Sequence, residues 1–135
     1  MSEIKKIFSK YKSIAMVGVS KDPKKTSTIV MKYMQDYGFK VYPVNPSAKG
    51  EKILGEEVYA SILEINKNVD IVDVFRPSSE AYRIAEDAVK IGAKVLWLQL
   101  GIRDENAKKL VEENKIEYIE NKCTKIEYEK LFFKR

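Results

Sequence analysis

Gly18 stands at the end of a short apolar run and is followed by a stretch of hydroxyl and ammonium side chains. A glycine there permits a tight turn, and a helix that begins after the turn presents free backbone N–H groups and a partial positive charge. The residues of this stretch that could contact an anion are Val19, Ser20, Lys24, Lys25, Thr26 and Ser27. The pattern predicts a phosphate-binding turn. The alternative is an ordinary strand-to-helix turn with a capped helix and two exposed lysines.

Small, polar or turn-forming residues also follow each of the other apolar runs. They are Asn45-Pro46, Arg76-Pro77, Gln99-Leu100-Gly101 and Asn121-Lys122-Cys123. In an open parallel sheet, ligands bind beyond the carboxyl ends of the strands, near the point where the strand order reverses. We therefore expect these residues to gather around one crevice. Arg76 has an alternative, because Glu80 lies four positions further on and could pair with it on a helix surface.

The spacing of apolar residues predicts the scaffold that would bring these residues together. It indicates buried strands near 13–19, 39–44, 69–75, 93–98 and 116–119, and helices over 3–11, 27–37, 79–91 and 104–114. Residues 61–64 and 124–127 have the spacing of a capping box and predict two further helix starts. Alternating strands and helices require right-handed crossovers between parallel strands. The expected fold is one α/β domain over residues 1–135, in which 1–12 form a lead-in helix. It is a three-layer, Rossmann-like, doubly wound parallel sheet of five strands in the order 3-2-1-4-5, with helices on both faces.

The composition excludes several kinds of chemistry. The chain has 135 residues, no histidine and one cysteine, Cys123. Histidine-based catalysis, histidine metal sites and structural zinc are therefore excluded, and we predict neither a catalytic set nor a metal site. An intramolecular disulfide is impossible and no apolar run has the length of a membrane span, so we expect a cytoplasmic protein without a membrane partner. The net charge of +5 is spread among interspersed lysines and glutamates, which disfavours nucleic acid as a partner.

Several segments together resemble the small stand-alone CoA-binding proteins, a family similar to the nucleotide-binding domain of the succinyl-CoA synthetase alpha subunit. The resemblance runs from about Ser13 to Phe132 and is carried by residues 17–20, 23–27, 42–46, 54–56, 72–76, 97–101 and 123–125. It implies that coenzyme A is the ligand and that the first turn and Lys25 hold its diphosphate. One departure is visible, since Lys25-Thr26-Ser27 stands where many relatives carry Arg-Pro-Ser. Lysine offers a point charge in place of a bidentate fork.

The resemblance also implies the walls of the site. The residues flanking the nucleotide would be Asn45, Pro46 and Lys49, the opposite wall would be formed by Phe75, Arg76 and Pro77, and the floor by Gln99 and Gly101. Coenzyme A carries a diphosphate and a separate 3′-phosphate, so two patches of positive charge are needed. Lys24 and Lys25 could supply one patch, and Lys49 or Arg76 the other.

The expected function is the binding of coenzyme A or an acyl-CoA by a regulatory or carrier module. One rival is an NAD(P)-dependent oxidoreductase, but only the first glycine of the dinucleotide fingerprint is present. The second strand also ends in Val44-Asn45-Pro46, without the acid that would hold a ribose. The other rivals are a CoA-ligase-like subunit that needs a partner, and an RNA-binding protein. The sequence leaves open whether the chain forms a homodimer.

Asp73 and Cys123 have more than one interpretation. Asp73 lies within an apolar run, so its carboxyl needs either a hydrogen-bond partner or a raised pKa. A structural hydrogen bond is the simpler account, and an acid–base role is the alternative. Cys123 could be a small core residue or a thiol that forms a mixed disulfide with coenzyme A. Trp97 is explained by core packing.

Overall fold

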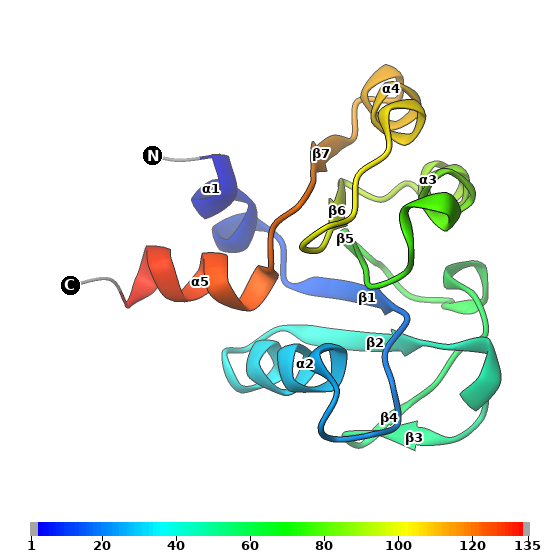
Figure 1. Ribbon diagram of the computed structural model, residues 1–135, viewed down its shortest axis with the longest axis vertical. Helices are drawn as coiled ribbons and strands as arrows, with labels where there is room; N and C mark the ends of the chain where they lie inside the picture. The colour runs from blue at the N-terminus through cyan, green and yellow to red at the C-terminus, as the bar shows by residue number, and fades with distance from the viewer. Residues whose placement is uncertain (1–2, 134–135) are drawn as a thin grey trace.

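A parallel sheet of five strands forms the centre of the molecule (Figure 1). The structure is a computed structural model that describes residues 3–133. Its main sheet consists of β1 (Ser13–Val17), β2 (Lys40–Val44), β5 (Ile71–Val74), β6 (Val95–Leu98) and β7 (Glu117–Ile119). All neighbouring strands in it run parallel, and their order is β2-β1-β5-β6-β7.

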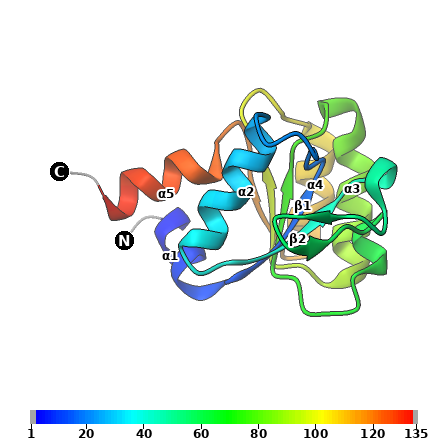
Figure 2. The same ribbon diagram turned by 90° about the horizontal axis from the view of Figure 1, so that it is seen from below.

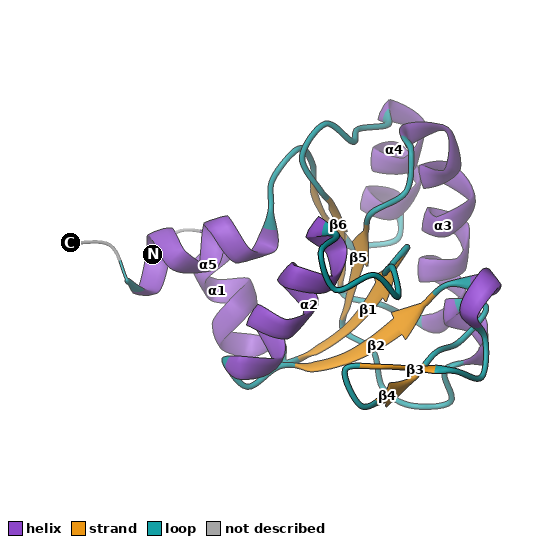
Figure 3. Ribbon diagram, turned by 60° about the horizontal axis from the view of Figure 1, so that its bottom comes forward, coloured by secondary structure: helices purple, strands orange, loops and turns teal. Residues whose placement is uncertain are grey.

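Helices cover both faces of this sheet, as Figures 2 and 3 show from two directions. One face carries α1 (Glu3–Lys10), α2 (Thr26–Asp36) and α5 (Thr124–Phe132), and the other carries α3 (Ser78–Ile91) and α4 (Glu105–Glu113). Side chains of β1 alternate between the two cores, with Ile14 and Met16 facing α2 and Ala15 and Val17 facing α3. The three-layer, Rossmann-like α/β fold expected from the sequence is confirmed. No helix within residues 3–133 is both long enough and apolar enough to cross a membrane.

The strand order differs from the expectation in one respect, the identity of the strand that follows β2 at the edge of the sheet. We expected residues 69–75 to lie beside β2, but β5 pairs with β1 on one side and β6 on the other. The outer side of β2 is occupied instead by the chain near Tyr59, which forms an isolated parallel bridge with Val44. Counting that bridge as a third strand gives the order 3-2-1-4-5-6, which contains the expected 3-2-1-4-5 pattern. All four residues of β5 are buried, as in a parallel strand with both faces covered by helices.

A small hairpin that we did not predict covers the same edge. It consists of β3 (Lys52–Ile53) and β4 (Glu56–Glu57), joined by Leu54 and Gly55, which have positive φ angles of 50° and 82°. The two 3₁₀ helices, η1 (Pro46–Ala48) and η2 (Ile62–Glu64), lie in the same connection between β2 and β5. The helix start predicted at 61–64 is confirmed, because Ser61 is the N-cap residue of η2 and its Oγ accepts a hydrogen bond from the Leu63 N–H. The reciprocal bond of a capping box is absent, since Glu64 Oε1 accepts from the Ala60 N–H instead of the Ser61 N–H.

The capping box expected at 124–127 is wrong in its detail. Cys123 is the N-cap residue of α5, and Thr124 is already helical. The Thr124 hydroxyl donates to Asp73 at 3.1 Å instead of capping the helix.

The lead-in helix α1 is part of the core, since the Phe8 ring stacks on Trp97 with ring centroids 5.4 Å apart. The Trp97 indole N–H donates to the Lys122 carbonyl at 2.8 Å, so packing accounts for this side chain.

Candidate functional site

The turn after β1 lies between the carboxyl ends of β2 and β5. Gly18 has a φ angle of +94°, and its N–H donates to the Val44 carbonyl at 2.8 Å. A Cβ atom on Gly18 would lie 2.9 Å from both the Phe75 carbonyl oxygen and Arg76 Cδ, closer than van der Waals contact permits. Only glycine therefore satisfies both the backbone conformation and the available space. β1 and β5 are neighbours in the sheet but are separated by two crossovers in the chain, so this turn lies at the topological switch point.

Hydroxyl groups hold the turn against the start of α2. The Ser20 N–H donates to Ser27 Oγ at 3.1 Å, and Thr28 Oγ1 lies 2.7 Å from the Ser20 carbonyl oxygen, to which it donates. Ser20 Oγ accepts from the Asp22 N–H at 3.0 Å. In these contacts the Ser20 and Ser27 hydroxyls act as acceptors, and a hydroxyl that accepts still has a proton to donate. Both remain able to bind an anion.

The first turn of α2 has the electrostatics of an anion site. Lys25 is its N-cap residue and makes no side-chain capping bond, and the first turn contains no acidic residue. The N–H groups at the start of a helix have no partner within the helix, and the dipole adds partial positive charge there. Lys24, Lys25 and Thr26 are exposed. Among residues 3–133, neither lysine takes part in an ion pair.

The Asn45 side chain makes two hydrogen bonds at the end of β2. Its Nδ2 donates to the Val19 carbonyl at 2.9 Å, and its Oδ1 accepts from the Ser47 N–H at 2.9 Å. The side chain thereby ties the end of β2 to the turn after β1. Pro46 follows it and lines a small pocket of about 60 Å³ between the ends of β1 and β2 and the start of α3.

Sequence reasoning missed some of the residues that line this pocket. Arg83, Asp87 and Ser61 are among its walls. The spacing of Glu80, Arg83 and Asp87 along α3 was a usable signal, because residues three and four apart share one face of a helix.

The second predicted patch of positive charge is already paired within the protein. Arg76 donates to Glu80 through Nε and Nη2, at 3.1 and 2.7 Å. This pair lowers the pKa of the Glu80 carboxyl, chiefly through the hydrogen bond from Arg76. Lys49 lies 3.2 Å from Glu64 in a similar exposed pair. Unlike Lys24 and Lys25, these two cations would have to exchange a carboxylate for a phosphate. Pro77, between Arg76 and α3, is the N-cap residue of that helix.

Gln99 and Gly101 follow β6, which β5 separates from β1. The Gln99 side chain is buried, and its amide nitrogen donates to Asp73 at 2.6 Å and to Thr124 at 3.1 Å. Gly101 is exposed, and its N–H donates to Asn121 Oδ1 at 2.7 Å. These contacts join β6 to the segment that leads into α5, whereas the contacts of Gly18, Asn45 and Arg76 join the ends of β1, β2 and β5.

Asp73 is the third residue of β5, and its side chain is fully buried. Burial is the main cause that raises the pKa of its carboxyl to about 7, and the hydrogen bonds from Gln99 and Thr124 oppose that shift. The partner expected from the sequence is therefore present. Cys123, which is 5% exposed, lies close by, and burial is also the main cause that raises the pKa of its thiol. A buried, protonated thiol fits the packing role better than a reactive one.

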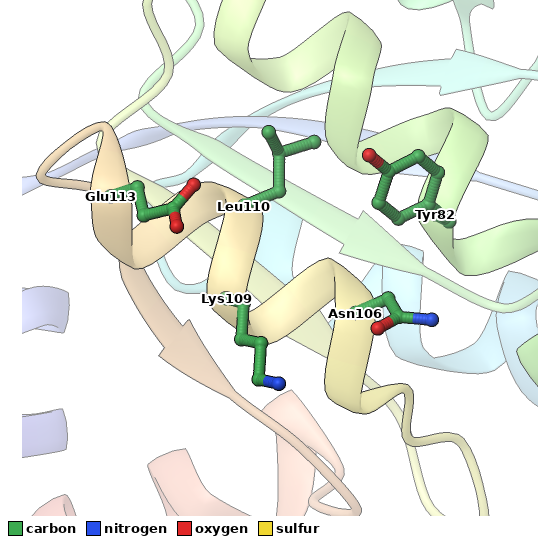
Figure 4. Close-up of a pocket in the computed structure, with 5 residues that line it drawn as sticks. All are labelled: Tyr82, Asn106, Lys109, Leu110 and Glu113. Atoms are coloured by element: carbon green, nitrogen blue, oxygen red, sulfur yellow. The ribbon is translucent and has the colours of Figure 1, made fainter.

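Another hollow, of about 320 Å³, lies between α3 and α4 (Figure 4). It is lined by Tyr82 from α3 and by Asn106, Lys109, Leu110 and Glu113 from α4. The predicted site residues lie elsewhere, at the carboxyl ends of the strands. The fold there is that of a Rossmann-like α/β domain.

Comparison with known proteins identifies the family. Residues 12–129 match the family model described as the CoA binding domain, so the chain belongs to this family. The protein YneT of Bacillus subtilis (strain 168) is 38% identical over 125 residues, covering 93% of this chain and 91% of YneT. The structure of ID.343 from Thermus thermophilus superimposes with a TM-score of 0.93 at 36% identity, covering 98% of this chain and 100% of that one. An acetate–CoA ligase [ADP-forming] of Methanocaldococcus jannaschii is 33% identical over 89 residues, which cover 66% of this chain but 12% of the ligase.

Proposed function

We propose that this protein binds coenzyme A or an acyl-CoA and acts as a regulatory or carrier module without a catalytic set of its own. The observation that carries the proposal is the turn at Gly18, packed against Phe75 and followed by two lysines that, within residues 3–133, have no carboxylate partner. Membership of the CoA binding domain family supports the identity of the ligand. The single buried cysteine is compatible with a cytoplasmic location.

In this proposal the diphosphate lies on the backbone amides at the start of α2, with Lys24 and Lys25 as its countercharges. Ser20 and Ser27 donate hydroxyl protons to the same group. The nucleotide lies between Asn45-Pro46 on one side and Phe75-Arg76-Pro77 on the other. Lys49 or Arg76 is the cation for the 3′-phosphate, and that residue gives up its present glutamate when the phosphate binds. Gln99 and Gly101 lie at the floor of the site in this proposal.

The test begins with the protein as purified. It is denatured, any released nucleotide is identified by mass, and thermal unfolding of ligand-free protein is compared with CoA, NADP and ATP. CoA at about 100 times its dissociation constant adds about 2.7 kcal/mol, which corresponds to roughly 10 °C for a domain of this size. A shift with NADP but none with CoA would overturn the proposal in favour of an oxidoreductase.

A second assay separates a binding module from a ligase. The protein is incubated with acetate, ATP, Mg²⁺ and CoA, and acetyl-CoA is measured. A binding module forms none, whereas formation of the thioester by this chain alone contradicts the absence of a catalytic set.

A further inference from the structure

A small pocket lies between α3 and the connection that follows β2. It has a volume of about 60 Å³, and α3 lines it with Glu80, Arg83, Ile84 and Asp87. Residues three and four apart share one side of a helix, and these four span about 10 Å along its axis. Ser61, at the start of η2, also lines the pocket. One side of α3 therefore faces this space.

Asp87 is a buried acid without a partner. It is 9% exposed, and within the part of the chain that the structure describes its carboxylate makes neither a hydrogen bond nor an ion pair. Its oxygen atoms are not sealed from solvent, since the Tyr33 hydroxyl is the only fully buried polar side-chain atom without a partner among residues 3–133. Asp87 lines the pocket, so its carboxylate faces that space. A buried charge without a partner is unfavourable, and a ligand that donates a hydrogen bond there removes the cost.

Arg83 lies one turn before Asp87 on the same side of α3 but does not pair with it. Arg76 and Glu80 have the same spacing and lie 2.7 Å apart. Arg83 is exposed and takes part in none of the ion pairs between described residues. The pocket thus presents an acceptor and a donor, one helical turn apart, that are not bound to each other. A ligand with a donor beside an acceptor can satisfy both.

The rest of the pocket is mostly apolar and adjoins the proposed phosphate turn. Its apolar lining residues are Val17, Val44, Pro46, Ala60, Ile62 and Ile84. Val17 directly precedes Gly18, and Val44 directly precedes Asn45. Apolar walls with one acceptor and one donor suit an aromatic base. Adenine carries an amino donor at position 6 beside a ring nitrogen that accepts, whereas guanine carries an oxygen at that position.

We propose that Asp87 and Arg83 recognise the base of the bound nucleotide and select adenine. Asp87 accepts a hydrogen bond from the 6-amino group, and Arg83 donates one to the adjacent ring nitrogen. The inference rests on the proposed function, because a nucleotide whose diphosphate lies on the Gly18 turn has its base at this pocket. The pocket is too small to enclose a purine, so the amino edge enters it and the rings lie at its mouth. A base with an oxygen at position 6 would face the carboxylate and bind weakly.

The test is isothermal titration with CoA and with the CoA analogue in which hypoxanthine, with an oxygen at position 6, replaces adenine. ADP and IDP form a second pair that differs in the same way. The wild type should bind CoA about tenfold more tightly than the analogue, because a hydrogen bond to a charged group is lost. Asp87→Asn keeps the shape of the side chain, but its amide can donate as well as accept, so most of this preference disappears. Glu86→Gln, at the exposed neighbouring position of α3, is the control and changes neither affinity.

Thermal unfolding without ligand separates recognition from a structural role. Asp87→Asn replaces an unpartnered carboxylate by a neutral amide, so it should keep or raise the melting temperature. A clear fall in the melting temperature, absent in Glu86→Gln, would show that Asp87 supports the fold and would contradict the inference.

The outcomes separate this inference from the proposed function. Equal affinities of the wild type for CoA and the analogue overturn base recognition and leave CoA binding in place, with water as the occupant of the pocket. A preference for CoA that Asp87→Asn retains also overturns it. A preference for ADP over IDP that Asp87→Asn removes, without binding of CoA, supports the base pocket and contradicts the proposed function. Binding of none of the four ligands overturns both.

Discussion

The Gly18 backbone lies so close to the Phe75 carbonyl that one added carbon atom would stand 2.9 Å from the oxygen. This contact joins the ends of β1 and β5, two neighbouring strands whose following helices, α2 and α3, pack on opposite faces of the sheet. It brings the residues after β1 and the residues after β5 together at the carboxyl edge of the sheet. The proposed binding of a phosphate-bearing ligand depends on this close approach.

Gly18→Ala is expected to destabilise the fold and weaken CoA binding. Gly38 provides the matched control, because its φ angle is +93° and no atom lies within 4 Å of the position that a Cβ would occupy. Gly38→Ala should cost roughly 1 kcal/mol from backbone conformation alone. Gly18→Ala adds the clash and should cost roughly 3 kcal/mol. Urea unfolding measures both, and equal losses in the two variants would show that the contact with Phe75 is unimportant.

Lys25→Ala should weaken CoA about tenfold, because a charge-assisted contact with a phosphate contributes about 1.5 kcal/mol. Lys24→Ala should have a smaller effect in the same direction, and affinity in the wild type should fall as salt is raised. Lys109→Ala, on the surface of α4, is the control for loss of one positive charge. Titration calorimetry gives the affinities, and equal affinities for Lys25→Ala and Lys109→Ala would exclude Lys25 as a phosphate ligand.

Asp73 should make the free energy of unfolding depend on pH. Burial raises its pKa to about 7 in the folded state, whereas in the unfolded chain the value is about 3.9. The folded state therefore keeps a proton that the unfolded state releases, and stability falls as pH rises from about 4 to about 7. Above pH 7 the decrease in the free energy of unfolding is complete and amounts to roughly 4 kcal/mol.

Asp73→Asn should abolish this part of the pH dependence, because an amide does not titrate and can bond to both Gln99 and Thr124. Burial and the neighbouring Glu3 raise the pKa of the Glu117 carboxyl to about 7. This carboxyl therefore adds to the pH dependence of stability in the same window, and its contribution is unchanged in the variant. Asp36→Asn, at an exposed carboxylate paired with Lys32, should leave the slope as in the wild type. Parallel slopes for the wild type and Asp73→Asn between pH 4 and 7 would contradict the raised pKa.

Cys123 is expected to be unreactive in the folded protein. Its thiol is buried, and burial raises its pKa, so little thiolate is present or accessible at pH 8. A thiol reagent such as dithiobisnitrobenzoate should react at least 100-fold more slowly with native protein than with protein in 6 M guanidinium chloride. Rapid native labelling, or a mixed disulfide formed with oxidised CoA, would support the reactive interpretation of Cys123 instead.

The fold class could be predicted because its signals are local. Compact apolar runs and helical spacing identified every strand of the main sheet and helices α1 to α4, and the capping-box spacing at 124–127 indicated the start of α5. The position of β5 beside β1 could not be predicted, because it depends on what covers the outer edge of β2. That edge is covered by a hairpin whose strands have two residues each, too short for any alternation to appear.

The candidate site shows the same division between local and tertiary information. The Gly18 turn, the lysines after it and the place of Asn45 at the end of β2 follow from residue type and position. The destination of a polar side chain does not, as Thr124 shows by bonding to Asp73 instead of capping α5. The pairing of Arg76 with Glu80 was one of two alternatives and is present in the structure, whereas a phosphate contact of Arg76 stays a prediction.

The most direct test of the central claim is an NMR titration of ¹⁵N-labelled protein with CoA. A phosphate site at the first turn predicts that the largest amide shift changes fall on Val19, Ser20 and residues 25–27, with smaller changes at Asn45 and Arg76. Gly18→Ala should remove these changes, and Gly38→Ala should preserve them. Saturable changes confined to other surfaces, or none at millimolar CoA, would contradict a phosphate site at this turn.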